Sequence, residues 1–276
     1  MTFDVAGADT HPAWCPGCGN FGILKAFNAA VDEAGIDTDK LVLVSGIGQA
    51  AKLPHYPQKR VSVFNGLHGR AIPAATGIKL ANHELEVVIT SGDGDIYGEG
   101  GNHFLHAIRR NVSIRVFVHN NQVYGLTKGQ ASPTSDVGFV TKVQTHGVIA
   151  QPFNPLAVAV AEGASFVARS FSGDFEHLKA MMVAALKCRE GFVLLDILQP
   201  CVTFNRVNTY KWYKDRVRKI DDSHDPTDRR AALELAFKWG DEIPIGLIYR
   251  SGRASFESQL GVLKGGPMTE QFSAKR

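Results

Sequence analysis

Two polar segments of the chain carry oxygen ligands that could hold a metal ion and a phosphate group. The glycines between residues 92 and 101 follow an apolar run, and they would let backbone amides approach a phosphate. Asp93 lies in this segment, and Mg2+ commonly bridges a carboxylate and a phosphate. The amide oxygen of Asn121 and the backbone carbonyl of Val123 follow the next apolar run and add two more oxygen ligands. Each segment alone could be an ordinary turn, but together they predict a magnesium–diphosphate site.

A Cys-x-x-Cys motif at Cys15 and Cys18 is the second candidate site. Two thiolates on a tight turn can bind one metal centre, and Cys201, which follows an apolar run, could bind the same centre. A structural zinc site and a thioredoxin-like dithiol are the alternatives, although zinc would need further soft ligands and the chain has no second Cys-x-x-Cys. Cys188 ends an apolar helical pattern and is predicted to be a buried thiol.

The composition limits the classes of protein to consider. Four cysteines in 276 residues argue against a disulfide scaffold and indicate a cytoplasmic protein. The net charge of +3 gives no indication of nucleic-acid binding. No apolar run approaches the roughly 20 residues that a membrane-spanning helix needs, and residues 1–12 lack the layout of a secretory signal. We therefore expect neither nucleic acid nor a membrane among the partners.

Apolar, β-branched runs alternate with helical patterns over most of the chain. Buried strands are predicted at residues 41–45, 61–64, 86–91, 114–119 and 192–197, and helices at residues 21–34, 72–81, 103–109, 155–162 and 176–186. This alternation predicts an α/β fold with a mostly parallel sheet and helices on both faces. Ligands of such sheets bind at the carboxyl ends of the strands, which is where the glycine-rich segments fall.

The composition changes near residue 205. Residues 1–205 are predicted to form the α/β domain, and residues 206–276 a C-terminal extension that wraps the domain or a partner. In the extension, Asp225 is expected to cap a helix that has Pro226 in its first turn and ends at Trp239. The remaining features expected there are a solvated basic face at 211–219, a strand at 245–249 and a loose polar end after residue 265.

The loop after the first predicted strand, Gly46 to Ala51, matches the G-x-G-x-x-A fingerprint of dinucleotide-binding proteins. Pro54 and Pro57 exclude the long helix that should follow, and no acidic residue lies about 20 positions downstream to bind a ribose. We therefore do not assign a dinucleotide to this loop. Lys52 lies on the same loop and, as a compact cation, could bind an anionic ligand, although most lysines are solvated surface residues.

These motifs together resemble the β subunit of 2-oxoacid:ferredoxin oxidoreductases, and the 2-oxoglutarate branch in particular. The resemblance covers residues 11–205 and is carried by four segments, Trp14–Asn20, His68–Arg70, Gly92–Asp95 and Val118–Thr134. It implies the diphosphate half of a thiamine diphosphate-binding fold, with Mg2+ held by Asp93, Asn121 and the carbonyl of Val123. The residues implied to contact the cofactor are Ile47, Gly48, Gln49, Ala50, His68, Gly94, Asp95, Gly125 and Leu126.

The same resemblance implies catalytic roles for His68 and Lys52, with Lys52 also contacting the substrate. It further implies a [4Fe–4S] cluster bound by Cys15, Cys18 and Cys201. The fourth cysteine of the family follows a Gly-Ile-Gly motif, and this chain has Gln49 at that position. Glutamine is a poor ligand for the iron of such clusters, which is normally held by thiolates, so the fourth ligand stays open.

The implied reaction is the CoA-dependent oxidative decarboxylation of a 2-oxoacid, in which 2-oxoglutarate gives succinyl-CoA and CO2. The reverse reaction would fix CO2 if the ferredoxin is reducing enough. The implied partners are ferredoxin, CoA, the 2-oxoacid and an α subunit that carries the pyrimidine half of the thiamine site, in a heterotetramer. The chain has one predicted sheet of this kind, so the acid that activates the cofactor is expected on another chain.

Two other classes of function remain open at this point. A non-oxidative thiamine diphosphate lyase would share the aspartate and asparagine motifs but would need no cysteines. A zinc-stabilised interaction subunit without catalysis would bind zinc and no thiamine. Analysis of the bound metal together with extraction of thiamine separates these classes from the oxidoreductase.

Overall fold

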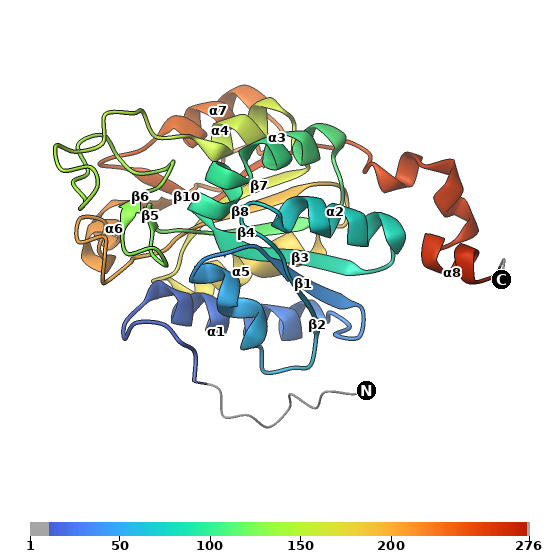
Figure 1. The fold of residues 1–276 in the computed structure, drawn as a ribbon. Coiled ribbons are helices and arrows are strands. Elements are labelled where there is room, and N and C mark those ends of the chain that lie inside the picture. The colour runs from blue at the N-terminus through green and yellow to red at the C-terminus, as the bar shows by residue number, and fades with distance from the viewer. Residues whose placement is uncertain (1–10, 275–276) are drawn as a thin grey trace.

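The computed structural model describes residues 11–274 of the chain, and its centre is an eight-stranded sheet with the order β2-β1-β3-β4-β8-β7-β10-β9 (Figure 1). Neighbouring strands are parallel except β7 and β10, which confirms the predicted mostly parallel sheet. The strands are β1 (Leu41–Ser45), β2 (Ser62–Asn65), β3 (Glu86–Gly92), β4 (Arg115–Asn120), β7 (Phe166–Phe171), β8 (Val193–Leu198), β9 (Val217–Lys219) and β10 (Ile243–Arg250).

Helices cover both faces of the sheet, as predicted. One face carries α1 (Gly19–Ala34) and α5 (Phe175–Lys187), and the other carries α2 (Ala71–Ala81), α3 (Gly101–Arg110), α4 (Pro155–Ala161) and α7 (Arg229–Phe237) (Figure 1). Shorter helical segments are η1 (Ala50–His55), η2 (Gly94–Glu99), α6 (Tyr210–Arg216), η3 (Glu257–Gln259), η4 (Gly261–Gly265) and α8 (Met268–Ser273). A hairpin of β5 (Val123–Tyr124) and β6 (Gln130–Ala131) follows β4.

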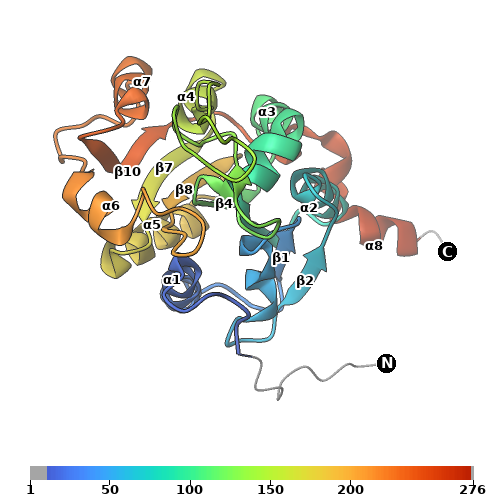
Figure 2. The same cartoon turned by 60° about the vertical axis from the view of Figure 1, so that its left-hand side comes forward.

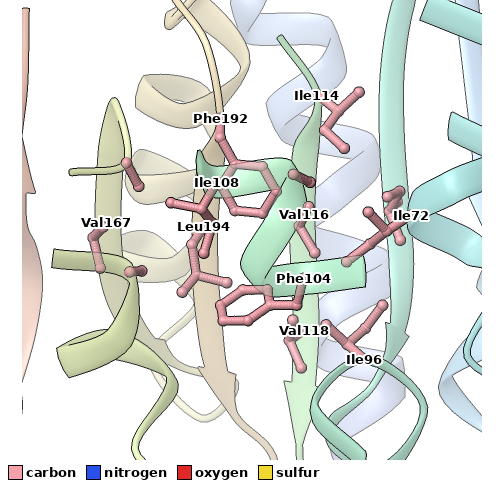
Figure 3. Close-up of a cluster of buried hydrophobic side chains, with 14 of the residues drawn as sticks. Ile72, Ile96, Phe104, Ile108, Ile114, Val116, Val118, Val167, Phe192 and Leu194 are labelled. Carbon is pink, nitrogen blue, oxygen red and sulfur yellow. The ribbon is translucent and has the colours of Figure 1, made fainter. Parts of the chain in front are cut away.

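The central strands are apolar along most of their length because helices cover both of their faces. Figure 3 shows Phe104 and Ile108 of α3 packed among Val116 of β4 and Leu194 of β8, and all four side chains are fully buried. Burying one side chain of this size contributes about 1.5–3 kcal/mol. This packing fixes the positions of the strands, and the strand ends in turn fix where the polar segments lie.

The carboxyl ends of β1 and β3 lie at the point where the order of the strands reverses. β1 pairs in parallel with β2 on one side and with β3 on the other. A crevice at such a switch point is the usual ligand site of an open α/β sheet. The loop after β1 and the loop after β3 both start here. The segment after β4 lies beside them, because Gly92 of β3 is paired with His119 of β4.

The sequence-based predictions differ from the structure at several places. β2 lies at the edge of the sheet, so its residues are exposed rather than buried. β7 was not predicted, because Arg169 interrupts its apolar pattern, although all of its residues are buried. Asp225 does not cap the helix, because its carboxylate accepts a hydrogen bond from Thr227 in a local turn and Asp228 caps α7 instead. α8 forms where a loose end was predicted.

The chain after residue 205 lies at both ends of the molecule. β10 and β9 extend the sheet beyond β7, with α6 and α7 at the same end of the molecule, whereas α8 lies beside α2 at the opposite end (Figure 2). Residues 1–10, which belong to the segment without the layout of a secretory signal, lie outside the described residues. Within residues 11–274, no helix combines the length and apolar character that crossing a bilayer requires.

Lys79, near the end of α2, is a buried cation that is 7% exposed. Its ammonium donates hydrogen bonds of 2.7 Å to the carbonyls of His83 and Leu85. Burial, with a smaller effect from the nearby Arg115 guanidinium, lowers the pKa of Lys79 to about 8. In the unfolded chain the pKa returns to about 10.4. Between these two pH values the unfolded chain therefore binds more protons than the folded chain.

We predict that the contribution of Lys79 makes the folded chain more stable as the pH rises from about 8 to about 10, by at most about 1.4 kcal/mol per pH unit. The Lys79→Met variant lacks this contribution. The wild type should therefore gain stability relative to the variant across that window, as measured by urea unfolding at a series of pH values. A difference in stability that is independent of pH would contradict the prediction.

Candidate functional site

The carboxylate of Asp95 connects three loops at the carboxyl edge of the sheet. Its Oδ1 atom accepts hydrogen bonds from the backbone amides of Ile47 (3.0 Å) and Gly69 (2.8 Å) and lies 2.7 Å from Nδ1 of His68. Its Oδ2 atom accepts a hydrogen bond of 2.8 Å from the hydroxyl of Ser91 in β3. Asp95 is 2% exposed, so these donors take the place of the water that a free carboxylate would bind.

Two glycines of these loops are needed for close approach within the chain itself. A Cβ atom at Gly46 would overlap both carboxylate oxygens of Asp95. A Cβ atom at Gly94 would overlap the ring of Tyr124, whose hydroxyl donates a hydrogen bond of 3.4 Å to the Gly94 carbonyl. The glycine pattern that predicted a phosphate site therefore also reflects the packing of one loop against another.

The contact with Asp95 orients the imidazole of His68. A carboxylate beside Nδ1 favours the tautomer that carries its proton there, which leaves the lone pair of Nε2 available as a proton acceptor. The His68 side chain is 39% exposed, and its ring centroid lies 6.2 Å from that of Tyr124 in an edge-to-face arrangement. The Nδ1 atom of His68 is thus held by Asp95, while the side chain remains partly exposed to solvent.

Asp93 follows β3 directly and is 1% exposed. Its Oδ2 atom accepts hydrogen bonds from the hydroxyls of Ser132 (2.5 Å) and Thr134 (2.7 Å), and the Thr134 hydroxyl also lies 2.9 Å from Asn120 at the end of β4. Burial raises the pKa of Asp93 to about 6, against the effect of the two hydroxyls and with a smaller rise caused by Asp196.

The donor set around Asp93 fits a divalent cation. Within residues 11–274, no lysine, arginine or histidine forms an ion pair with this carboxylate. A buried carboxylate without a cationic partner is costly, and a bound Mg2+ would supply the missing charge. Asn121 and Val123 offer further oxygen atoms, which Mg2+ prefers.

The turn after β4, which carries Asn121 and Val123, contains a residue in a strained conformation. Gln122 has a φ of 60°, in the left-handed region that non-glycine residues rarely adopt. Its side-chain amide donates a hydrogen bond of 2.6 Å to the Thr134 carbonyl, which holds the turn in place. The side-chain oxygen of Asn121 accepts a hydrogen bond of 3.0 Å from the Val123 amide. An amide oxygen has a second lone pair, so this bond does not exclude a metal.

Three cysteines from distant parts of the chain line one pocket. Cys15 and Cys18 precede α1, and Cys201 follows β8. The pocket has a volume of about 40 Å³, with the exposed Cys15 on its wall beside the buried Cys201. Its other lining residues are Trp14, Asn20, Gln49, Asn121, Gly125, Gln199, Val202, Thr203 and Phe204. Since Asn121 and Gly125 belong to the segment after β4, the cysteine pocket borders the candidate magnesium site.

The environment of Cys18 makes it a protonated thiol when no metal is bound. Burial raises its pKa to about 11, helped by Cys201 and Cys15 and opposed by a hydrogen bond from the Asn20 amide. The side-chain amide of Gln199 donates a hydrogen bond of 3.4 Å to the Cys18 sulfur. A metal that binds here must therefore displace a proton.

Two further findings bear on the cysteines. No group of three or more His, Cys, Asp or Glu side chains in residues 11–274 is arranged around a single metal ion. Cys188 is 6% exposed, lies in the core at the end of α5 and does not line the pocket, as its place at the end of an apolar helix predicted.

The other residues expected at the site lie on the loops around the same edge. Residues 47–49 are partly exposed and Ala50 is buried. Lys52 is half-buried on η1, and within residues 11–274 its ammonium has neither an ion pair nor a hydrogen bond. Leu126 is 44% exposed. Pro54 lies inside η1 and no long helix follows, which agrees with the exclusion of a dinucleotide site.

Some residues of the site carry only a weak signal in the sequence. Ser132 and Thr134 stand about ten positions after the asparagine pair, and nothing in their spacing indicates that they bond Asp93. Gln199 precedes Cys201 by two positions and reaches back to Cys18. A hydroxyl or amide near a motif is the one available indication, and it does not distinguish a site residue from an ordinary turn residue.

Two family models match this chain over adjacent segments. Residues 46–197 match the C-terminal TPP-binding domain of thiamine pyrophosphate enzymes, and residues 201–265 match the C-terminal part of the pyruvate ferredoxin oxidoreductase β subunit. Together with the polar loops at the switch point, the first match defines the fold as a thiamine diphosphate-binding domain.

Similar proteins narrow this class further. The chain is 46% identical to the 2-oxoacid:ferredoxin oxidoreductase subunit beta of Saccharolobus solfataricus, over 89% of this chain and 84% of that protein. It is 39% identical to the 2-oxoglutarate synthase subunit KorB of Archaeoglobus fulgidus, over 78% and 82% of the two chains. The structure of 2-oxoglutarate:ferredoxin oxidoreductase from Magnetococcus marinus, with 2-oxoglutarate, coenzyme A and succinyl-CoA bound, matches with a TM-score of 0.89 and 35% identity, over 97% of this chain and 93% of that chain.

This chain belongs to the β subunits of the 2-oxoacid:ferredoxin oxidoreductases. The family match confirms the resemblance drawn from the sequence motifs. It makes the chain one subunit of an oxidoreductase and implies an α subunit as its partner.

We predict that Asp95→Ala lowers the free energy of unfolding by about 3 kcal/mol or more, because the buried amides of Ile47 and Gly69 lose a charged acceptor and such bonds contribute about 1.5–3 kcal/mol each. Chemical denaturation measures the change. Asp37→Ala is the matched control, because this exposed carboxylate accepts a bond from the amide of Asp39 in a surface turn and its loss should cost about 1 kcal/mol or less. Equal effects of the two substitutions would show that Asp95 does not hold the loops.

Proposed function

We propose that this chain, with an α subunit, catalyses the CoA-dependent oxidative decarboxylation of 2-oxoglutarate to succinyl-CoA and CO2, with ferredoxin as electron acceptor. One observation carries the proposal: the pocket lined by Cys15, Cys18 and Cys201 shares Asn121 and Gly125 with the candidate cofactor segment. An oxidative reaction needs a redox centre beside the thiamine, and a non-oxidative one does not. Relatives that are named for 2-oxoglutarate, or were solved with it and CoA bound, support the choice of substrate.

The cofactor would bind across the loops after β1, β3 and β4. Mg2+ would be held by Asp93, Asn121 and the carbonyl of Val123, and it would bind the diphosphate. Bound thiamine diphosphate supplies the nucleophilic carbon and accepts the electron pair that remains when CO2 leaves. The residues proposed to surround it are Ile47, Gly48, Gln49, Ala50, His68, Gly94, Asp95, Gly125 and Leu126.

Two side chains of this subunit are proposed to act on the substrate. Lys52, whose ammonium has no partner within the described residues, would bind the distal carboxylate of 2-oxoglutarate. His68 would hold or accept a proton at Nε2, because Asp95 keeps the proton of the other ring nitrogen in place. His68 lies beside the Asp95 carboxylate, and Lys52 lies on η1, directly after the loop whose Ile47 amide the same carboxylate binds.

The cysteine pocket is proposed to hold the [4Fe–4S] cluster through which the electrons leave. 2-Oxoglutarate, CoA and two oxidised ferredoxins give succinyl-CoA, CO2, one proton and two reduced ferredoxins, so two electrons must leave singly. A cluster needs more room than the 40 Å³ between the side chains, so we place it towards the exposed Cys15. The reverse reaction, which fixes CO2, follows if the ferredoxin is reducing enough.

The two alternative functions, a non-oxidative thiamine lyase and a zinc-stabilised interaction subunit, each leave part of the site unexplained. A non-oxidative lyase leaves the three converging cysteines without a role, and a zinc-stabilised interaction subunit leaves the buried Asp93 without a cation. Iron and acid-labile sulfide analysis, combined with thiamine extraction from the purified complex, tests the proposal. Iron, sulfide and thiamine together are expected, whereas zinc without thiamine, or thiamine without iron, would refute it.

We also infer that residues 206–276 form an extension on the 1–205 domain. The two family models end and begin at residues 197 and 201, which supports a division close to residue 205. The extension lies at both ends of the sheet through β10 and α8, an arrangement suited to wrapping the domain or reaching a partner.

We predict that the isolated chain binds thiamine diphosphate weakly and turns over slowly, because it supplies one half of a thiamine site. Addition of the α subunit should restore both properties and give a complex with the mass of a heterotetramer. Cofactor retention after gel filtration and reduction of ferredoxin measure the two effects. Turnover by the purified chain alone at the rate of the complex would contradict this view of the partner.

We predict that Lys52→Met in the complex raises the KM for 2-oxoglutarate at least about tenfold, because one ion pair that is lost at a partly buried site costs more than about 1.4 kcal/mol. The KM for a 2-oxo monoacid such as 2-oxobutyrate should change little. Lys211→Met, which breaks an exposed ion pair with Asp215, is the control. A similar change for both substrates would show that Lys52 does not bind the distal carboxylate.

A further inference from the structure

Gln49 has an unusual environment for a glutamine side chain. Its Oε1 atom is buried, and within the described residues it has no hydrogen-bond partner. A buried acceptor without a partner costs roughly 1–3 kcal/mol, so such an atom calls for an explanation such as an ion. Its backbone is fixed as well, because the Gln49 carbonyl accepts a hydrogen bond of 2.8 Å from the Trp14 indole, beside Cys15.

The surroundings of Gln49 indicate which kind of ion would satisfy that oxygen. Gln49 lines the same pocket as Cys15, Cys18 and Cys201, and Gly125 of the cofactor segment packs close to its side chain. Three thiol ligands and one unpartnered amide oxygen therefore converge on one pocket. Gln49 also stands at the position where the proposed cluster lacks a fourth cysteine.

We propose that the Oε1 atom of Gln49 binds the fourth iron of the cluster, so that three irons are held by thiolates and one by a neutral amide oxygen. This inference rests on the proposed function, because it requires the cluster. Amide oxygen is a weaker ligand for cluster iron than thiolate. The fourth iron is therefore chemically distinct from the other three, and it is the first to leave.

The ligand also changes the charge of the redox centre. A neutral amide in place of a thiolate makes the cluster with its ligands one unit less negative. Because net charge is one of the factors that set the potential of such clusters, this raises the reduction potential. A higher potential makes the cluster a better acceptor of electrons from the substrate, and it lowers by the same amount the driving force for passing those electrons on to ferredoxin.

The loss of iron can be written as a balanced step. Ferricyanide removes one electron from [4Fe–4S]2+ and becomes ferrocyanide. The resulting [4Fe–4S]3+ then releases the iron bound by Gln49 as Fe2+ and leaves [3Fe–4S]+ on Cys15, Cys18 and Cys201. The product has a characteristic EPR signal, and a chelator captures the released Fe2+. Neither readout depends on enzyme activity.

The experiment compares the wild-type αβ complex, purified without oxygen, with Gln49→Cys and Gln49→Leu. After one equivalent of ferricyanide, the wild type should release one Fe2+ per cluster and develop the three-iron signal. Gln49→Cys should keep all four irons and show a lower midpoint potential. Gln49→Leu should lose the fourth iron before any oxidant is added. Gln58→Cys places a new thiol on an exposed loop, and it should behave as the wild type.

The outcomes separate this inference from the proposed function. A wild-type cluster that keeps four irons under ferricyanide refutes the role of Gln49 and leaves the oxidoreductase intact, and so does a midpoint potential that Gln49→Cys leaves unchanged. A complex that contains no iron and sulfide refutes both. The wild-type measurement alone decides against the inference even if a variant at position 49 fails to fold.

Discussion

The site depends on one buried carboxylate. Asp95 accepts hydrogen bonds from the loop after β1, from the loop that carries His68 and Gly69, and from the end of β3. These segments would otherwise be three independent glycine-rich loops, each with a large entropy to lose on binding a ligand. Because the bonds are already made within the chain, the switch point of the sheet is ordered in advance. The close packing of Gly94 against the Tyr124 ring connects the loop after β3 to the segment after β4.

The neighbouring carboxylate, Asp93, is in the opposite situation. It has hydroxyl donors from Ser132 and Thr134 but no cationic partner among the described residues, and its burial raises its pKa. One aspartate is satisfied by the chain and the other fits a cation, although they stand two positions apart in one motif. The same contrast appears in the cysteine pocket, where Gln199 donates to Cys18 while the Gln49 oxygen has no partner. The Asp93 carboxylate, which lacks a cation, and the Gln49 oxygen, which lacks a hydrogen-bond donor, therefore indicate where ligands would bind.

The elements with strong periodicity could be predicted from the sequence, and those with weak patterns could not. The central strands β3, β4 and β8 are continuous apolar runs, which a sheet buried on both faces requires. β7 has the same burial but carries Arg169, whose charge hides the pattern in the sequence and which the fold places near Asp196 and over the Trp239 ring. Asp225 and Asp228 are both good capping residues, and only the path of the chain decides which one caps α7.

The sequence by itself determined the chemical groups: an aspartate and an asparagine suited to Mg2+, thiols suited to a metal centre, and glutamine in place of a fourth cysteine. These follow from residue type and short-range spacing, which are local properties. The tertiary structure alone decided that Asn121 stands on the wall of the cysteine pocket and that Ser132 and Thr134 reach Asp93. It also brings Cys201 to the pocket of Cys15 and Cys18, which the sequence had suggested. Those contacts join residues far apart in the chain, and they exist because parallel strands bring their carboxyl ends to one edge of the sheet.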